Sequence, residues 1–297
     1  WLEANSDVAA NLDIPPKTVY ENRFYECADI SFDNFAWFEK NQTGKTKYLN
    51  MLQGSNPQEY DWWYQKFKHF EFQGWAIGGP QKLVDFMWAL ALMLKNREFE
   101  KVNLEYLHLL GISKISDFFI LSTIQKCLNK HYGNRIVVTT DSSSPGQYPV
   151  YGTYLHSHNF KKLSFTDVYM AKLDLLDAPD QLVPCSLDCP ACKDFTWDML
   201  NDYNSSAVPR MVLHNVHVFD HTIKEVNKIV AAHREVAQYV VPNNLAAVLK
   251  SIYEMFEDPD AAITTYEKYK QYYQRFGGQS ITTINKDIFN QFFEEKL

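Results

Sequence analysis

The chain has 297 residues, of which 46% are hydrophobic and 15% aromatic, and it carries a net charge of −7. This length and composition can bury a large core, which excludes disordered and fibrous proteins. The acidic balance argues against indiscriminate nucleic-acid binding but leaves a local basic groove open. No apolar run reaches the roughly 20 residues of a membrane helix, so we expect a soluble protein that does not contact membranes.

Short β-rich runs alternate with helical patterns through the first half of the chain. An early strand is expected to end near Asp13, where a double proline follows. The later runs end in glycine or a small polar residue, and the last of them recur at roughly 30 residues, the length of one βα unit. These later strands are predicted at Tyr48–Gln53, Phe70–Ile77, Leu104–Leu110 and Arg135–Thr140.

The intervening segments Gln81–Lys95 and Ile115–Lys130 have the pattern of amphipathic helices that could cover a parallel sheet. The alternation predicts an α/β fold that is either barrel-like or doubly wound. After Asp141 the pattern becomes rich in loops, and from about Val212 onward it is helical. One large α/β domain with an appendage is therefore the simplest organisation.

Three of the five cysteines fall within eight residues, at positions Cys185, Cys189 and Cys192. Two residues separate the last two, a gap that lets both thiolates reach one tetrahedral ion. A metal site is favoured over free thiols or a disulfide, and a reducing compartment fits best. For the fourth ligand we favour His214 over His217 and His221, which share one helical face with it. With four protein ligands the metal would be structural.

Polar residues or glycines stand where the predicted strands end, which in a parallel barrel is where reactive groups gather. These candidates are Asp13, Gln53, Gly78, Gly79, His108 and Asp141. Asp141 has the best context, because the three serines that follow it could hold its carboxylate ionised and oriented. The alternatives are structural: Asp141 and Asp13 could cap turns, and Gly78 with Gly79 could form a tight turn.

Taken in chain order, these motifs resemble the tRNA-guanine transglycosylase family from about Asp13 to about Val226. The matching segments are Leu52-Gln53-Gly54, Gly74-Trp75-Ala76-Ile77-Gly78-Gly79, His108 to Ser113, Asp141, the cysteine segment and Leu213-His214-Asn215. The cysteine spacing departs from the family, being three then two residues instead of one then two. The family's Ser-Gly-Gly motif and aspartate acid/base do not occur in this chain, and we expect them upstream of Trp1.

The resemblance implies a (β/α)8 TIM barrel whose N-terminal strands are missing from this chain, with an inserted zinc-binding subdomain and a helical C-terminal tail. On this basis residues 1–180 form the C-terminal part of the catalytic barrel. Residues 181–221 then form the zinc-binding subdomain, and residues 222–297 form the helical C-terminal region.

The resemblance also implies a pentosyltransferase that exchanges guanine in a nucleic acid for a 7-deazaguanine base, as in queuosine-type modification, through a covalent intermediate. Asp141 matches the family's nucleophile. Asp13 matches the carboxylate that binds the purine edge, and Gln53 the side chain on the base carbonyl. The backbone of Gly78 and Gly79 completes the base pocket. A structural zinc would be held by Cys185, Cys189, Cys192 and His214.

The run Asp141-Ser-Ser-Ser, together with Gly74-Trp75, is closer to the DNA-modifying relatives of phages and bacteria than to the bacterial tRNA enzymes. DNA is therefore the favoured polymer and tRNA the alternative. A catalytically silent partner subunit and a zinc-bound nucleic-acid-binding module without catalysis are the other readings. Family members often pair through the zinc region, which leaves a homodimer open. The resemblance implies a cytoplasmic location in a bacterial cell or a phage-infected host.

Overall fold

The computed structural model describes residues 6–11, 13–14, 23–78, 82–169, 207–232 and 240–275, and between 170 and 206 only residues 182, 185, 187, 189–196, 198 and 199. The chain forms two compact units. The first, called the sheet unit, comprises Trp1–Ile112, Ile120–Asp141 and Asn244–Gly278. The second, called the hairpin unit, comprises Ser113–Phe119, Ser142–Asn243 and Gln279–Leu297. The predicted domain boundaries after residues 180 and 221 stay predictions.

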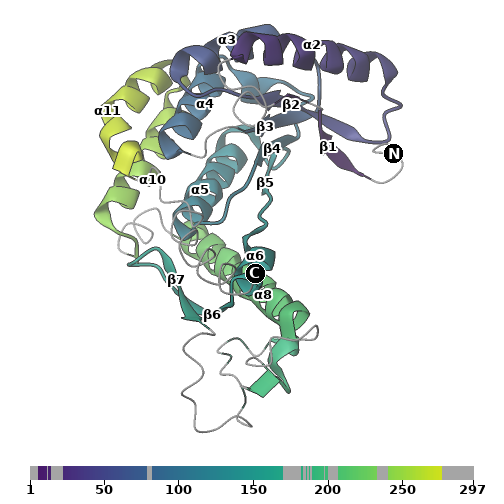
Figure 1. The fold of residues 1–297 in the computed structure, drawn as a ribbon. Coiled ribbons are helices and arrows are strands. Elements are labelled where there is room, and N and C mark those ends of the chain that lie inside the picture. The colour runs from purple at the N-terminus through teal and green to yellow at the C-terminus, as the bar shows by residue number, and fades with distance from the viewer. Residues whose placement is uncertain are drawn as a thin grey trace. The chain divides into compact units, whose positions relative to one another are not determined.

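The sheet unit contains five parallel strands that lie side by side in chain order, each paired with the next. They are β1 (Val8–Ala10), β2 (Lys47–Leu52), β3 (Gly74–Ile77), β4 (Tyr106–Leu109) and β5 (Val137–Thr140). Figure 1 shows the sheet curled like half of a barrel. A doubly wound sheet reverses its strand order at a switch point, which this sheet does not do. The prediction of a barrel-like α/β fold is confirmed. Strands β3, β4 and β5 lie within their predicted segments, β2 begins one residue before its predicted segment, and β1 ends three residues before the predicted Asp13.

A helix follows each of the first four strands and lies on one face of the sheet (Figure 1). These helices are α2 (Phe24–Asn41), α3 (Pro57–Phe67), α4 (Leu83–Lys95) and α5 (Ile115–Tyr132), the last belonging to this unit from Ile120 on. The unit also contains α10 (Asn243–Glu257), α11 (Ala262–Arg275) and the short 3₁₀ helices η1 (Glu98–Glu100) and η4 (Pro259–Ala261). The two helices expected between predicted strands are confirmed. The part of the predicted C-terminal region that the structure describes is helical as far as Arg275.

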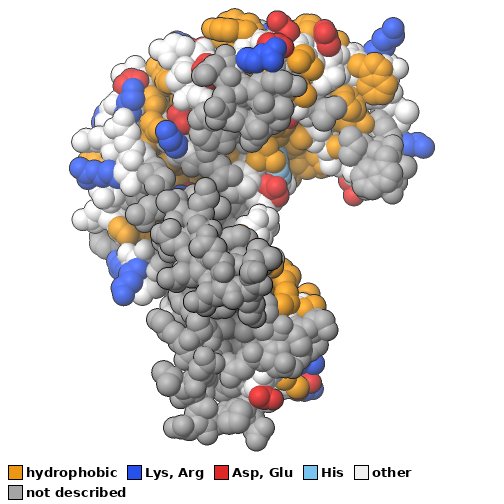
Figure 2. All heavy atoms as spheres, viewed as in Figure 1, with side chains coloured by type: hydrophobic (Ala, Val, Ile, Leu, Met, Phe, Trp, Pro, Cys, Tyr) orange, Lys and Arg blue, Asp and Glu red, His pale blue; other side chains and the backbone are white. Residues whose placement is uncertain are grey.

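Helix α2 buries one stripe and exposes another. Its inward side chains, which include Cys27, Ser31 and Phe35, are fully buried. Hydrophobic side chains also reach the surface over this helix (Figure 2), where Tyr25 and Trp37 are about 60% exposed. Helix α2 therefore carries exposed aromatic side chains beside its buried stripe.

Trp75 of β3 marks the helix-covered face of the sheet. Its indole Nε1 donates a hydrogen bond of 2.8 Å to the carboxylate of Glu98, which is only 1% exposed. The same carboxylate accepts a 2.6 Å hydrogen bond from the hydroxyl of Tyr64 on α3 and pairs with Lys101 at 2.8 Å. A buried carboxylate is tolerated because donors satisfy it.

The opposite face of the sheet carries a row of side chains set by the strand register. Met51, Ala76, His108 and Thr139 are register partners across β2 to β5, and register partners in a parallel sheet point to the same face. Gly74 lies on this face too, because a Cβ there would come within 2.8 Å of the Leu49 side chain. His108 and Thr139 are partly exposed, so this face is accessible toward β4 and β5.

The hairpin unit is built around two antiparallel strands and one long helix. Strands β6 (Thr153–Asn159) and β7 (Ser164–Tyr169) pair with each other, and α6 (Ser144–Val150), the 3₁₀ helix η3 (Pro190–Cys192) and α8 (Ala207–Ala231) complete it. Helix α8 starts five residues before the predicted Val212. Within the described residues, no helix is long and apolar enough to cross a membrane.

Candidate active site and metal centre

Those predicted substrate and catalytic residues that the structure describes lie at one edge of the sheet. In a parallel sheet the carboxyl ends of all strands meet at the same edge. Asp13 lies three residues after β1, Gln53 and Gly78 directly follow β2 and β3, and Asp141 directly follows β5. Gly79 lies outside the described residues, so its predicted role stays a prediction.

Asp13 and Gln53 contact each other directly. The Gln53 amide Nε2 donates a 2.7 Å hydrogen bond to Oδ2 of Asp13, and Gln53 is 4% exposed. The backbone N–H of Ile14 donates to the hydroxyl of Ser31 on α2, which holds the segment after Asp13 in place. Burial raises the pKa of Asp13, and the hydrogen bond from Gln53 opposes that rise. The two side chains together offer a donor and acceptors to a flat polar ligand.

Gly78 completes this group for a steric reason. A Cβ on Gly78 would lie 2.6 Å from Nε2 of Gln53, closer than real Cβ contacts come. Its own N–H donates to the Leu52 carbonyl at 3.1 Å, which keeps the backbone against the end of β2. A larger residue at this position would therefore force the Gln53 amide to shift away from this backbone.

Asp141 is held by the loop that follows β4. Its Oδ1 accepts a 2.6 Å hydrogen bond from the N–H of Gly111, and its own carbonyl accepts one of 2.9 Å from Ile112. Gly111 has a φ of 69°, a left-handed conformation that favours glycine. The Asp141 side chain is still 60% exposed. The carboxylate is thus anchored by one oxygen and open to solvent.

His108 of β4, another of the candidates predicted near the strand ends, lies beside Asp141. Its Nε2 is 3.7 Å from Oδ1 of Asp141, and its Nδ1 is 2.9 Å from the hydroxyl of Thr139. Burial lowers the pKa of His108, and the charge of Asp141 opposes that shift. The pairing of His108 with Thr139 follows from the register between β4 and β5, which the sequence alone does not reveal.

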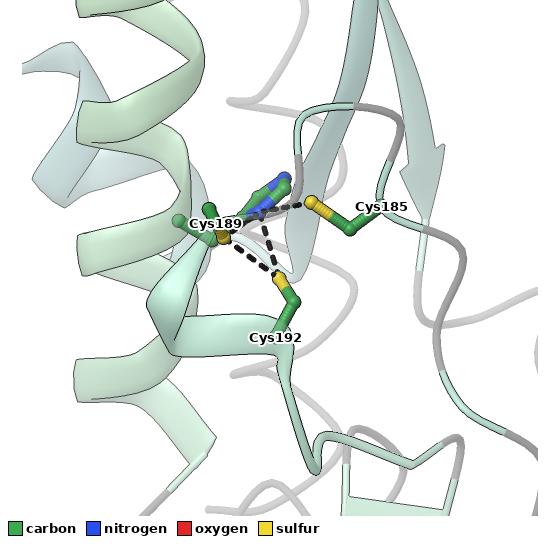
Figure 3. A group of neighbouring side chains, drawn as sticks. Cys185, Cys189 and Cys192 are labelled. Atoms are coloured by element: carbon green, nitrogen blue, oxygen red, sulfur yellow. Dashed lines mark hydrogen bonds between the residues drawn. The ribbon is translucent and has the colours of Figure 1, made fainter.

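The four predicted metal ligands lie together in the hairpin unit. The ligand atoms of Cys185, Cys189, Cys192 and His214 are all within 4.8 Å of one another (Figure 3). The Nδ1 atom of His214 is 3.8, 3.2 and 2.9 Å from the three sulfur atoms in chain order. Cys189, Cys192 and His214 are buried, and Cys185 is partly buried. The fourth ligand is therefore contributed by α8, while η3 and the segment before it contribute the thiols.

The tautomer of His214 suits a metal ligand. Its Nε2 is 2.5 Å from the carbonyl oxygen of Leu155, so Nε2 carries the proton and donates it. The Nδ1 lone pair then points toward the three sulfur atoms, an orientation commonly set by such a second hydrogen bond. Burial lowers the pKa of His214 to about 4, which keeps the imidazole neutral at pH 7.

Neighbouring groups hold the cluster in shape. The ring of Tyr154 stacks on His214 with centroids 4.0 Å apart, and its hydroxyl is 3.2 Å from Sγ of Cys192. The amide of Asn215 bonds the backbone of Leu155 and Thr153, which fixes α8 against β6. Three sulfur ligands and one imidazole are a donor set that zinc prefers. The cluster could hold a metal ion such as zinc.

No protein-family model matches the chain, and no curated protein matches it. The fold and the two groups of side chains define an α/β protein with a half-barrel parallel sheet and a candidate metal centre of three cysteines and one histidine.

Proposed function

We propose that this protein is a transglycosylase that exchanges guanine in a nucleic acid, with DNA favoured over tRNA, for a 7-deazaguanine base. The observation that carries the proposal is the placement of Asp141. Its carboxylate is anchored by Gly111, is 60% exposed, and follows the last strand of a sheet whose same edge carries the Asp13 and Gln53 pair.

The chemistry assigned to Asp141 is nucleophilic displacement at the sugar. A carboxylate oxygen attacks C1′, the bond from C1′ to the guanine nitrogen breaks, and the leaving purine takes the electron pair and then a proton. The incoming base attacks C1′ and loses its own proton, which releases the Asp141 carboxylate. The hydrogen bond from the N–H of Gly111 supports this role because it orients the carboxylate.

Base recognition is assigned to Asp13, Gln53 and the backbone of Gly78. A carboxylate can accept two hydrogen bonds from the amino and imino edge of a guanine, and an amide can bond its carbonyl side. The nucleotide would be extruded from its stack to reach this sheet edge. The contact between Gln53 and Asp13 supports a shared role, because it orders both groups before a base binds.

The proposal includes a (β/α)8 barrel and a structural zinc. Five parallel strands in chain order, the first four each followed by a helix, are what a part of such a barrel contains. Zinc with four protein ligands would leave no open position, so it would stabilise the hairpin unit without taking part in the exchange.

The test is base incorporation by the full-length protein. Purified protein is incubated with duplex DNA or with tRNA, each with a radiolabelled 7-deazaguanine, and label retained in the polymer is counted. Wild type is expected to label DNA, and Asp141→Asn is expected to lose at least about 10³-fold of the rate, as nucleophile variants do. Glu100→Gln, an exposed change on η1, serves as the control and should match wild type.

Each outcome decides something. Label in tRNA and not in DNA would support the exchange reaction and contradict the choice of DNA as the substrate. Label in neither, from protein that retains one zinc, would contradict the exchange reaction and favour a catalytically silent partner subunit. Equal rates in Asp141→Asn and wild type would remove Asp141 as nucleophile.

A further inference from the structure

A second group of nitrogen and oxygen ligand atoms lies on β6 and α8, outside the cysteine cluster. Nε2 of His158 is 3.6 Å from Oε2 of Glu225, and Nε2 of His221 is 3.6 Å from Oε1 of the same carboxylate. The carboxylate therefore stands between two imidazoles, each facing one of its oxygens. His158 is 16% exposed, while His221 and Glu225 are about 40% exposed.

Thr222 fixes which nitrogen of His158 carries the proton. The hydroxyl of Thr222 donates to the Val218 carbonyl at 2.7 Å, so its single proton is already used. That hydroxyl is also 3.1 Å from Nδ1 of His158 and must accept there, which places the proton on Nδ1. The Nε2 lone pair then faces the Glu225 carboxylate. Phe160 stacks on the His158 ring at 4.3 Å and holds its orientation.

Two lone-pair atoms facing each other at 3.6 Å repel unless a cation lies between them. A proton on Nε2 would be one such cation, but it would make the ring a doubly protonated imidazolium, because the contact with Thr222 already places a proton on Nδ1. A metal ion would satisfy the same pair without protonating the ring.

We propose that His158, Glu225 and His221 form a second metal site, which binds a divalent transition ion such as Zn²⁺. Two ligand atoms 3.6 Å apart, each about 2.1 Å from one ion, subtend about 118° at it, close to the tetrahedral angle. The pair His158 with Glu225 and the pair His221 with Glu225 each have this separation. The His158 and His221 ring centroids are 6.1 Å apart. His221 is partly exposed, and a change of its rotamer toward His158 would let one ion bind both imidazoles and Glu225.

This site differs in chemistry from the cysteine cluster, with which it shares only α8 as a source of ligands. Three protein ligands leave at least one coordination position for water or an anionic oxygen, whereas the cluster supplies four. The donors are imidazole and carboxylate without sulfur, so the second site binds more weakly. His214 and His221 are seven residues apart on α8, about 10 Å along the helix axis, which keeps the two ions apart. The site stands independently of the proposed base exchange.

The experiment is a zinc titration of the full chain. Protein preloaded with one equivalent of Zn²⁺, which fills the cysteine cluster, is titrated with further Zn²⁺ in a calorimeter at pH 7.5. Wild type is expected to bind one more equivalent. Glu225→Gln and His221→Ala are each expected to raise the dissociation constant of this second event at least about 10-fold. His217→Ala removes a histidine from the same helix outside the group and should leave the second event unchanged.

Thr222→Val provides a variant that retains all three ligands. It removes only the hydroxyl that orients His158, and it should weaken the second event while circular dichroism stays native. The proposal is overturned if wild type binds no second equivalent. It is overturned as well if Glu225→Gln and His221→Ala both bind the second ion with wild-type affinity.

Discussion

Nε2 of His108 lies 3.7 Å from Oδ1 of Asp141, the carboxylate oxygen that also accepts the Gly111 N–H. The imidazole reaches this position because β4 and β5 pair His108 with Thr139, whose hydroxyl contacts Nδ1. The charge state of His108 therefore acts directly on the proposed nucleophile.

His108 is expected to shape the pH dependence of exchange. Burial lowers its pKa from the ordinary value, so the ring is neutral at pH 7 and becomes charged only as pH falls through that lowered pKa. The imidazolium would then attract the carboxylate and compete with the sugar for it. In His108→Gln the loss of rate on the acid side should move to lower pH. The shift is measured from rates of label incorporation between about pH 4.5 and 8. Coincident pH profiles of wild type and His108→Gln would rule out a role of His108 in the pH dependence.

Gly78→Ala should weaken base binding without unfolding the sheet unit. The new Cβ would come within 2.6 Å of Nε2 of Gln53 and displace the amide from Asp13. Losing one such polar contact costs about 1–3 kcal/mol, or about 5- to 150-fold in affinity for a 7-deazaguanine. Gly146→Ala is the matched control, since nothing lies within 4 Å of its Cβ. Equal base affinities in the two variants would contradict the assigned pocket.

Cys192→Ser should release the metal from the cysteine cluster. Cys192 is 6% exposed and its sulfur is 2.9 Å from Nδ1 of His214, so its loss removes a ligand at the centre of the group. Metal analysis should find less than one tightly bound zinc, and the melting temperature should fall by several degrees, as it should after chelation of wild type. Cys27→Ala, in the sheet unit, should keep its zinc. Full zinc content in Cys192→Ser would contradict the assignment.

Glu98→Gln should destabilise the sheet unit. The carboxylate accepts hydrogen bonds from Tyr64 and Trp75, and an amide can present only one oxygen to these two donors. One buried donor is left unsatisfied, which costs about 1–3 kcal/mol. Urea unfolding of Glu98→Gln beside the exposed Glu100→Gln measures the difference, and equal midpoints would show that the buried carboxylate contributes little.

The strands and helices were predictable because their signals are local. Hydrophobic periodicity, glycine at strand ends and the double proline act within a few residues, so five strands and two helices were placed within a few residues of their observed bounds. The exact ends differ, as in β3, which begins at Gly74 and not at Phe70. There Phe70 and Phe72 pack in the core outside the strand, where hydrophobicity alone does not distinguish strand from loop.

By itself, the sequence determined the alternation of strands and helices and the thiol spacing that suits one ion. The tertiary structure decided the choice between barrel and doubly wound order, the use of His214 in the cluster, and the placement of His108 beside Asp141. His214, His217 and His221 share one face of α8, so spacing along the chain does not separate them. The carbonyl of Leu155 on β6 distinguishes His214 from the other two, because it accepts a hydrogen bond from Nε2 of His214 and so turns Nδ1 toward the thiols. Such contacts depend on strand register and helix packing, which join residues far apart in the chain.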